Sequence, residues 1–259
     1  MNSDLPASEI KDNECASLLN IAFSQDQALH TRLGTVIQNT SPATFGGRTT
    51  SLFSALFSSG SQYLLETSAA GVTYESPEGT YTSIKGAASL PSDVWQQWKM
   101  FDDYAINVNG SLNGSGHLNP FKWSGAGDIS QLADGGGNAP RGKFIEVWNQ
   151  RLWIVSADNP NVLHYSKLGD PENYTVGGGS IEINVNDGDV ITGIYAHKGF
   201  LFIFKKKHIY RIKTGEPNTD DTKWSRELVA GNVGCIHQAS IQSVLDDVVF
   251  LSYGGVTSL

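Results

Sequence analysis

The chain has 259 residues, with 18 Lys and Arg against 26 Asp and Glu, so it is long enough for one large domain or two small ones. Its 39% hydrophobic and 17% charged residues exclude a disordered chain and a coiled coil, while 28 glycines and few helix-favouring runs predict an all-β fold. The net charge of −8 argues against a protein that coats DNA, but leaves a local basic strip open.

The first 45 residues differ in pattern from the rest and predict an N-terminal arm over 1–45 that packs against something else. A short helix is expected from about residue 8 to 20, with an apolar side formed by Ile10, Cys15, Leu18, Leu19 and Ala22. Beyond Asp26 the pattern becomes extended and polar, which predicts no further helix.

Residues 46–259 repeat one unit, in which two apolar runs flank a short polar turn. Five copies are found, at 52–57 with 63–65, 98–101 with 104–108, 144–148 with 152–155, 191–195 with 200–204, and 241–245 with 248–251. Their turn centres, at 60, 103, 150, 198 and 247, are 43 to 49 residues apart. This spacing is typical of propeller blades and predicts a β-propeller-like array of antiparallel blades, closed or open.

Three of the units continue into a third strand, predicted at 162–165, 208–212 and 256–257. The alternative is a β-sandwich, which also shows short strands and frequent turns. The glycine-rich connectors 109–116 and 124–142 are expected to be surface loops.

The two cysteines, Cys15 and Cys235, have no CxxC spacing and no histidine pair beside them, which predicts free thiols in a reducing compartment. The chain opens without a basic segment followed by an apolar one, and it has no run of 18 apolar residues. Neither secretion nor a membrane partner is therefore expected.

No catalytic constellation is recognised, and the sequence predicts no catalytic residue, no metal site and no cofactor. His164, His197, His208 and His237 share no motif, although His197 and His208 could approach each other within one unit. The segment 184–189 resembles part of a calcium loop but lacks its distal Glu, and it lies where a hairpin turn is expected. The segment 156–160 resembles the start of a sialidase-type turn without its glycine and tryptophan.

One charge feature is unusual, because six of the 18 basic residues fall within 16 positions: Lys198, Lys205, Lys206, Lys207, Arg211 and Lys213. If the strands around Lys206 and Lys207 pair as a hairpin, these side chains gather at its tip and along its solvent face. They then either discourage edge pairing or contact an anionic partner, such as nucleic-acid phosphates or an acidic subunit. The candidate contact residues are Lys205, Lys206, Lys207, Arg211 and Lys213.

Several short motifs follow one another through the middle of the chain. They are 144–148 with Asn149, Arg151 and Leu152, then Tyr165-Ser166, 169–174 (GDPENY), 187–193 (DGDVITG), and 202–205 before 209–211. Near the N-terminus stand Ile10, Asp12-Asn13, Leu19-Asn20 and Arg32-Leu33-Gly34. In these motifs, none of them catalytic, the chain resembles the packaged-DNA stabilisation and tail-nozzle proteins of short-tailed (podovirus-like) bacteriophages.

The resemblance implies a non-enzymatic structural virion protein, made in the bacterial host cytoplasm and located in the phage tail. Such a subunit joins a homo-oligomeric ring, expected to be a hexamer, that contacts portal, adaptor or tail subunits around the packaged DNA in the exit channel. It helps to retain and deliver the genome. The acidic balance suits such a channel, because a negative wall lets DNA slide without sticking.

This chain departs from the family at its C-terminal end, where 256–259 stops within a strand pattern while family members run on through further blades. The expectation is either a fragment or short version, or a neighbouring subunit that covers the exposed blade face. The alternative function is a glycan-binding or glycan-cleaving propeller of a tail spike or sialidase-like protein, in which Trp95, Trp98, Trp123 and Tyr174 would stack on sugars. A cytosolic protein-interaction propeller is a third hypothesis.

Overall fold

The computed structural model divides the chain into two units, residues 1–40 and 41–259, which are described separately. It describes residues 21–23, 29–31, 49–68, 71–75, 81–86, 95–110, 112–113, 116–117, 119–134, 137–215 and 223–259. The helix expected over 8–20, with Cys15, and most of the predicted arm lie outside the described residues. Ala22, expected on the apolar side of that helix, instead lies in strand β1 (Ile21–Phe23), which pairs antiparallel with β2 (Leu29–Thr31).

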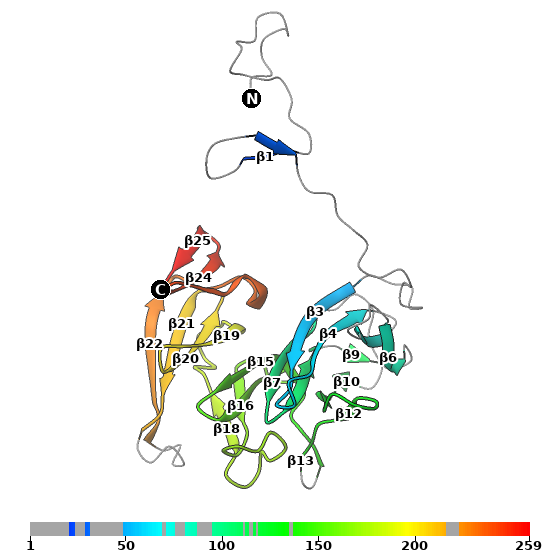
Figure 1. Ribbon diagram of the computed structural model, residues 1–259. Helices are drawn as coiled ribbons and strands as arrows, with labels where there is room; N and C mark the ends of the chain where they lie inside the picture. Colours follow the sequence, from blue (N-terminus) through cyan, green and yellow to red (C-terminus); the bar gives the residue numbers. More distant parts are fainter. Residues whose placement is uncertain are drawn as a thin grey trace, which may run out of the picture. The chain divides into compact units, whose positions relative to one another are not determined.

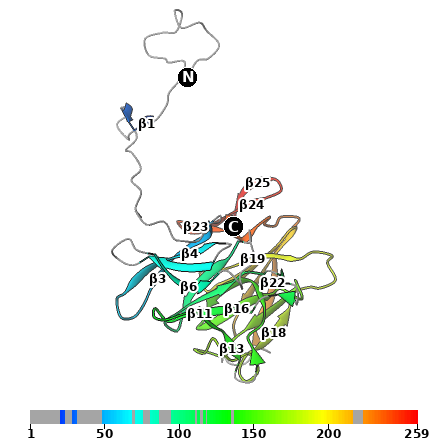
Figure 2. The same ribbon diagram turned by 90° about the vertical axis from the view of Figure 1, so that its right-hand side faces the viewer.

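The second unit is built from antiparallel sheets, here named blades A to E in chain order (Figure 1 and Figure 2). Blade A contains β3 (Thr49–Leu56), β4 (Gln62–Ser68), β5 (Gly71–Glu75) and β6 (Tyr81–Gly86). Blade B contains β7 (Gln97–Phe101), β8 (Tyr104–Val108), β11 (Phe121–Trp123) and β12 (Ser130–Gln131). Blade C contains β15 (Gly142–Trp148), β16 (Arg151–Ser156), β17 (Val162–Tyr165) and β18 (Gly179–Glu182).

Blade D contains β19 (Ile191–His197), β20 (Phe200–Lys205), β21 (His208–Lys213) and β22 (Ser225–Gly231). Blade E contains three strands within the described residues, β23 (Gln242–Val244), β24 (Asp247–Ser252) and β25 (Gly255–Ser258). Among the described residues of both units, the only helical element with assigned bounds is one short 3-10 turn, Gln238–Ser240. No helix in this part of the chain is long and apolar enough to span a membrane.

The all-β prediction is confirmed, and so are all five hairpins, which form β3–β4, β7–β8, β15–β16, β19–β20 and β23–β24. The predicted third strands are also present, as β17, β21 and β25. The sequence pattern did not reveal the remaining strands of blades A and B or the outer strands β18 and β22, because these carry few apolar residues or follow long connectors.

The glycine-rich connectors are only partly the surface loops that were expected. They contain the two-residue pairs β9 (Leu112–Asn113) with β10 (Gly116–His117) and β13 (Ala133–Asp134) with β14 (Gly137–Asn138). Leu132 and Ala139 are buried in the second connector. This connector has too few apolar residues to show the alternating pattern of a strand. Its two buried residues nevertheless pack between blades B and C.

The central strands of the array are buried on both faces, which explains their continuous apolar sequence. In β16, Leu152 and Ile154 belong to the cluster between blades B and C, while Trp153 and Val155 belong to the cluster between blades C and D. Further clusters join blade A to B and blade D to E. Consecutive blades therefore bury the faces that they turn toward each other.

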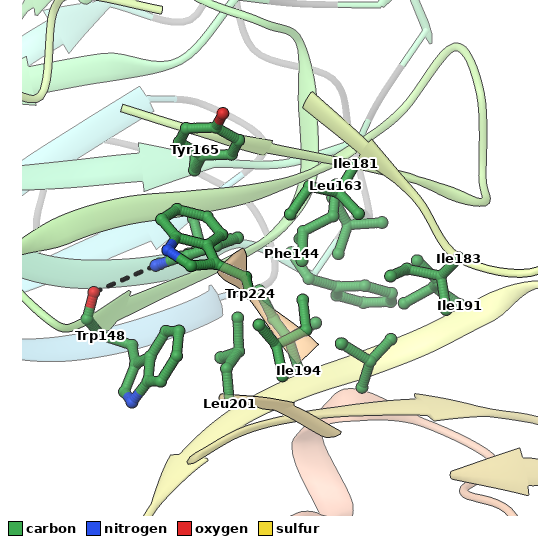
Figure 3. Close-up of a cluster of buried hydrophobic side chains, with 14 residues drawn as sticks. Phe144, Trp148, Leu163, Tyr165, Ile181, Ile183, Ile191, Ile194, Leu201 and Trp224 are labelled. Atoms are coloured by element: carbon green, nitrogen blue, oxygen red, sulfur yellow. Dashed lines mark hydrogen bonds between the residues drawn. The ribbon is translucent and has the colours of Figure 1, made fainter. Parts of the chain in front are cut away.

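The largest of these clusters, between blades C and D, is rich in aromatic side chains (Figure 3). Trp153 and Tyr165 lie 5.3 Å apart between ring centroids, and Trp224 lies within 5.4 Å of both. The buried Trp153 Nε1–H donates to the Trp148 carbonyl oxygen at 3.0 Å. This bond satisfies the indole's polar atom, so the ring can be buried without an unpaired donor.

The hairpin turns explain the polar residues at the repeat centres. Asn149 and Gln150, with φ of 53° and 57°, form a two-residue loop of the type whose twist matches paired strands, and Asp102-Asp103 and Lys198-Gly199 do the same. Blade E departs from this rule, because its loop places Leu245 at φ 55° with 95% of its side chain exposed. Leucine is strained in this conformation, whereas asparagine tolerates it.

Replacement Leu245→Asn is therefore expected to raise the free energy of unfolding by about 1 kcal/mol, because it relieves the positive-φ strain. Urea unfolding measures the change. Val176→Asn is the control, since Val176 is an exposed apolar residue without a positive φ. Equal gains from both replacements would show that exposed apolar surface, and not the backbone conformation, is responsible.

Candidate functional site

The predicted basic cluster lies on one hairpin of blade D, formed by β20, the turn Lys206-Lys207 and β21, and here named the lysine hairpin. The structure confirms the hairpin, but its basic side chains differ in exposure and do not lie together. Lys206, Lys207 and Lys213 are exposed, Arg211 is half-buried, and Lys205 has 0% of its surface exposed. The five candidate residues thus do not form one surface.

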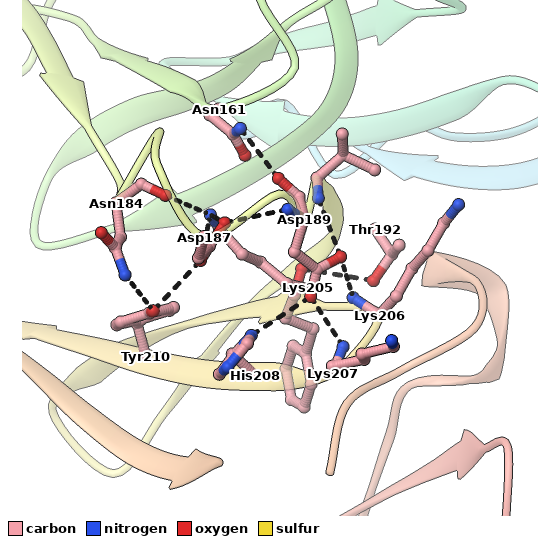
Figure 4. A network of polar contacts seen from close by, with 12 residues as sticks. Asn161, Asn184, Asp187, Asp189, Thr192, Lys205, Lys206, Lys207, His208 and Tyr210 are labelled. Carbon is pink, nitrogen blue, oxygen red and sulfur yellow. Dashed lines mark hydrogen bonds and ion pairs between the residues drawn. The ribbon is translucent and has the colours of Figure 1, made fainter. Parts of the chain in front are cut away.

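Lys205 is buried because of the two-residue period of its strand. Leu201 and Ile203 point toward blade C, and Phe202 and Phe204 point toward blade E, so Lys205 continues the row that faces blade C. Its ammonium group lies 2.8 and 3.0 Å from the two carboxylate oxygens of Asp187 (Figure 4). The prediction that Lys205 contacts an external anion is therefore wrong.

The acidic partner comes from the connector between β18 and β19, which contains the calcium-like segment 184–189. This segment was expected to form a hairpin turn, but β18 and β19 belong to different sheets, so it is a blade-to-blade connector. The oxygen atoms of this segment bind the Lys205 ammonium group, in the way that those of a calcium loop bind the ion. Besides the Asp187 carboxylate, Lys205 Nζ contacts the Asn184 carbonyl oxygen, to which it donates at 3.0 Å. Among the described residues, no group of three or more His, Cys, Asp or Glu is placed to bind a metal ion.

Asp189 fixes the turn of the lysine hairpin from the same connector (Figure 4). Its carboxylate accepts the backbone N–H groups of Lys206 and Lys207 at 3.1 and 2.8 Å, and it lies 3.3 Å from His208 Nδ1. The turn therefore has a rigid backbone, while the Lys206 and Lys207 side chains remain exposed.

Both connector carboxyl groups favour their ionised form. Burial by itself would raise the pKa of Asp187, but the hydrogen bonds from Lys205 and the Asp189 N–H, with the Lys205 charge, hold it below the usual value. Burial also opposes ionisation of Asp189, and its pKa is lowered by the N–H groups of Lys207, Val190 and Lys206 together with His208.

Arg211 is neutralised on the other side of the hairpin. Its guanidinium lies 2.7 Å from Glu227 on β22 and stacks on the Phe200 ring at 4.6 Å. Lys213 stands at the opposite end of β21 from the turn. The charge that remains at the hairpin tip is therefore that of Lys206 and Lys207.

A groove of about 580 Å³ opens beside these two lysines and is here named the lysine groove. Its other walls are the connector from blade D to blade E and the β24–β25 turn, and its lining is Lys206, Lys207, Asn232, Val233, Gly234, Ser252, Tyr253, Gly254 and Thr257. Gly234 is required for this close approach, because a Cβ there would overlap the carbonyl oxygen of Lys205 and the backbone of Lys206.

The sequence interpretation missed a second polar system, which links the first strands of blades C and D to residues of the neighbouring blade or of the turn before it. The Gln97 side-chain oxygen accepts the Ile145 N–H at 2.9 Å. The Gln238 side chain accepts the Ile194 N–H at 2.6 Å and donates to the Ile194 carbonyl oxygen at 2.9 Å. Lys99 pairs with the buried Glu146 at 2.8 Å. Burial raises the pKa of Glu146, and the Lys99 charge opposes that shift. Single polar residues in apolar strands carry no spacing signal, so only the packing reveals them.

His197 and His208 do not approach each other within blade D. His197, which contacts the Asp246 carbonyl oxygen, ends β19, whereas His208 begins β21 beside the turn at the opposite end of the blade. Of the aromatic residues considered for sugar stacking, Trp98, Trp123 and Tyr174 are buried. The half-buried Trp95 packs against the His237 ring, with 5.4 Å between centroids.

No family model and no curated protein matches the chain, but solved structures do. A catalytically inactive virginiamycin B lyase from Staphylococcus aureus with quinupristin matches with a TM-score of 0.54 and 15% identity over 92% of this chain and 73% of the lyase. A streptogramin B lyase matches with a TM-score of 0.50 and 15% identity over 92% and 74% of the two chains. These likenesses confirm the β-propeller-like fold and show the fold alone, although it is one that enzymes also use.

Breaking the buried ion pair between Lys205 and Asp187 is expected to destabilise the fold strongly. Asp187→Asn leaves the Lys205 ammonium buried without its counter-charge, which should lower the free energy of unfolding by about 3–5 kcal/mol in urea titrations. The double replacement of Lys205 by Met and Asp187 by Leu should lose less, because no charge is left unpaired. Glu227→Gln, which breaks the exposed pair with Arg211, is the control and should cost at most about 1 kcal/mol. Equal losses from Asp187→Asn and Glu227→Gln would contradict this assignment.

The free energy of unfolding should also depend on pH in the acidic range. A carboxyl group with a lowered folded pKa adds stability above its unfolded pKa of about 4, and this stability is lost as the pH falls through the folded pKa. We expect the free energy of unfolding to fall below about pH 4, and Asp189→Asn to flatten that fall. Asp246→Asn is the control, since Asp246 is highly exposed. A pH profile unchanged by Asp189→Asn would contradict the role given to this carboxylate.

Proposed function

We propose that this chain is a structural, non-enzymatic virion protein in the tail nozzle or head-completion assembly of a short-tailed phage. In this role it forms part of the ring around the DNA exit channel and helps retain and deliver the genome. One observation supports the proposal. Residues of the motifs in which the chain resembles that family are buried or bond to other parts of the fold.

The GDPENY motif, 169–174, illustrates this use. Glu172 pairs with Lys122 of blade B at 2.5 Å and accepts the Ala133 N–H at 3.0 Å, so the motif joins blade C to blade B. Tyr174 is buried in the cluster between the same blades. The residues therefore hold the blades together, as expected of a scaffold protein.

Arg151, from the same set of motifs, is equally internal. It is 2% exposed and donates to the carbonyl oxygens of Ser166 and Gly177, both at 2.6 Å. Asp187 and Lys205, which belong to two further motifs, pair with each other. Arg151, Asp187 and Lys205 stabilise the fold instead of presenting a reactive group to a substrate.

Exposed apolar side chains at both ends of the blade array support a role among neighbouring subunits. Blade A exposes Leu52 and Leu56 on β3, and blade E exposes Val244, Leu251 and Val256. Clustered surface of this kind is typical of protein contacts, and head-to-tail contacts between copies generate rings. Portal, adaptor and tail subunits are the other partners of the proposed assembly.

The proposal predicts that the protein is present in purified particles at the neck or tail. Immunogold labelling and particle imaging should locate it there in a ring around the channel. A particle purified from a strain lacking the coding sequence is the control for labelling. Absence of the chain from mature particles would contradict the virion role.

A glycan-binding or glycan-cleaving propeller is the alternative. The burial of Trp98, Trp123 and Tyr174 removes three of its four proposed stacking residues. Glycan-array binding and glycosidase assays separate the two functions, since specific, saturable sugar binding would favour the alternative.

A further inference from the structure

We propose that the lysine groove binds a nucleotide unit, with Lys206 and Lys207 on the phosphate and Tyr253 against the base. This proposal goes beyond the virion role and does not depend on it, because every group that it needs lies within one chain.

The first argument is charge. In a chain of net charge −8, this groove of about 580 Å³ is lined by two lysines and by no carboxylate. Lys206 and Lys207 are exposed, and neither ammonium group has a hydrogen-bond or ion-pair partner among the residues that the structure describes. Unpaired ammonium groups on two consecutive residues attract phosphate.

The second argument comes from the corresponding positions between other blades. The groove between blades B and C, of about 480 Å³, is lined by Arg141 and His164 but also by Asp158, which lies 4.0 Å from Arg141. Between blades C and D, the connector places Asp187 and Asp189 against the lysine hairpin. Only the blade D to blade E position, within the described residues, presents basic side chains without an acidic partner in the lining.

The third argument is the aromatic wall. Tyr253 lines the groove from the β24–β25 turn and has 71% of its surface exposed. The adjacent hydroxyl groups are occupied, because Ser252 Oγ donates to the Gly255 carbonyl oxygen and accepts the Gly254 N–H. They shape the turn that carries Tyr253. A rigid aromatic ring beside a cationic patch is the arrangement that holds nucleotides by stacking and phosphate contact.

The turn is preorganised for such a ligand. Asp189 holds the backbone N–H groups of Lys206 and Lys207, and Gly234 allows the connector to lie directly against them. The Asp189 carboxylate faces the turn from the blade C side and is already engaged by these N–H groups, so it reduces the positive potential of the groove without cancelling it. Lys205 adds no free charge, because Asp187 neutralises it.

Fluorescence anisotropy with labelled single-stranded oligo-dT at low salt tests the proposal on the full chain. Replacing both Lys206 and Lys207 by Gln should weaken binding at least tenfold and reduce the salt slope by about 0.7, the value for one lost phosphate contact on a single strand. Lys198→Gln removes a single positive charge from the opposite end of blade D and should change affinity less than twofold. Thermal unfolding confirms that each variant folds.

Tyr253→Ala should weaken binding by about 5- to 150-fold, while Tyr253→Phe should retain it, because stacking needs the ring and not the hydroxyl group. Competition identifies the source of the nucleotide unit. Displacement of the oligonucleotide by ATP points to a free nucleotide, and resistance to ATP points to a strand.

Three results would overturn the proposal: an affinity unchanged by the double lysine replacement, equal losses from Lys198→Gln, or displacement by polyglutamate as effective as displacement by oligo-dT. The last result would identify the groove as a contact for an acidic protein. Each of these results leaves the particle-imaging test of the virion role unaffected.

Discussion

The structure depends on one constraint, which is that the central strands have two apolar faces and both must be covered. A single antiparallel blade cannot cover its own faces, so each one is stable only between neighbours. In β20, Leu201 and Ile203 require blade C while Phe202 and Phe204 require blade E. The order of the blades, the connectors between them and the exposed apolar faces at the two ends all follow from this requirement.

The same constraint determines where polar residues act. Polar side chains that fall between blades lose water and need partners, and the partner is usually supplied by the next blade. Gln97 binds the backbone of blade C, Gln238 binds that of blade D, and Glu172 pairs across blades with Lys122. Apolar packing between blades is not directional, whereas these hydrogen bonds and this ion pair require one relative placement of the two blades.

The lysine hairpin shows how this packing divides one cluster of charges into two roles. Lys205 continues an apolar row into the blade interface and becomes an internal counter-ion for Asp187. Lys206 and Lys207 follow at the turn, where no neighbouring blade covers them. The internal charge stabilises the junction of blades C and D, and the external charges face the lysine groove. A structural role in an assembly and a nucleotide-binding groove are therefore compatible within one hairpin.

The sequence alone determined the all-β class, the five hairpins and four of their turns, because apolar runs and polar turn residues are local signals. The fifth turn, at Leu245-Asp246, lies one residue before its predicted position. It also located the lysine hairpin and therefore part of the groove. Only the tertiary structure decided that the segment 184–189 crosses between sheets, that the connector 124–142 buries Leu132, and that Lys205 is internal while Tyr253 lines the same groove as Lys206 and Lys207. The physical reason is that these outcomes depend on which blade covers which face, and residues distant in the chain make those contacts.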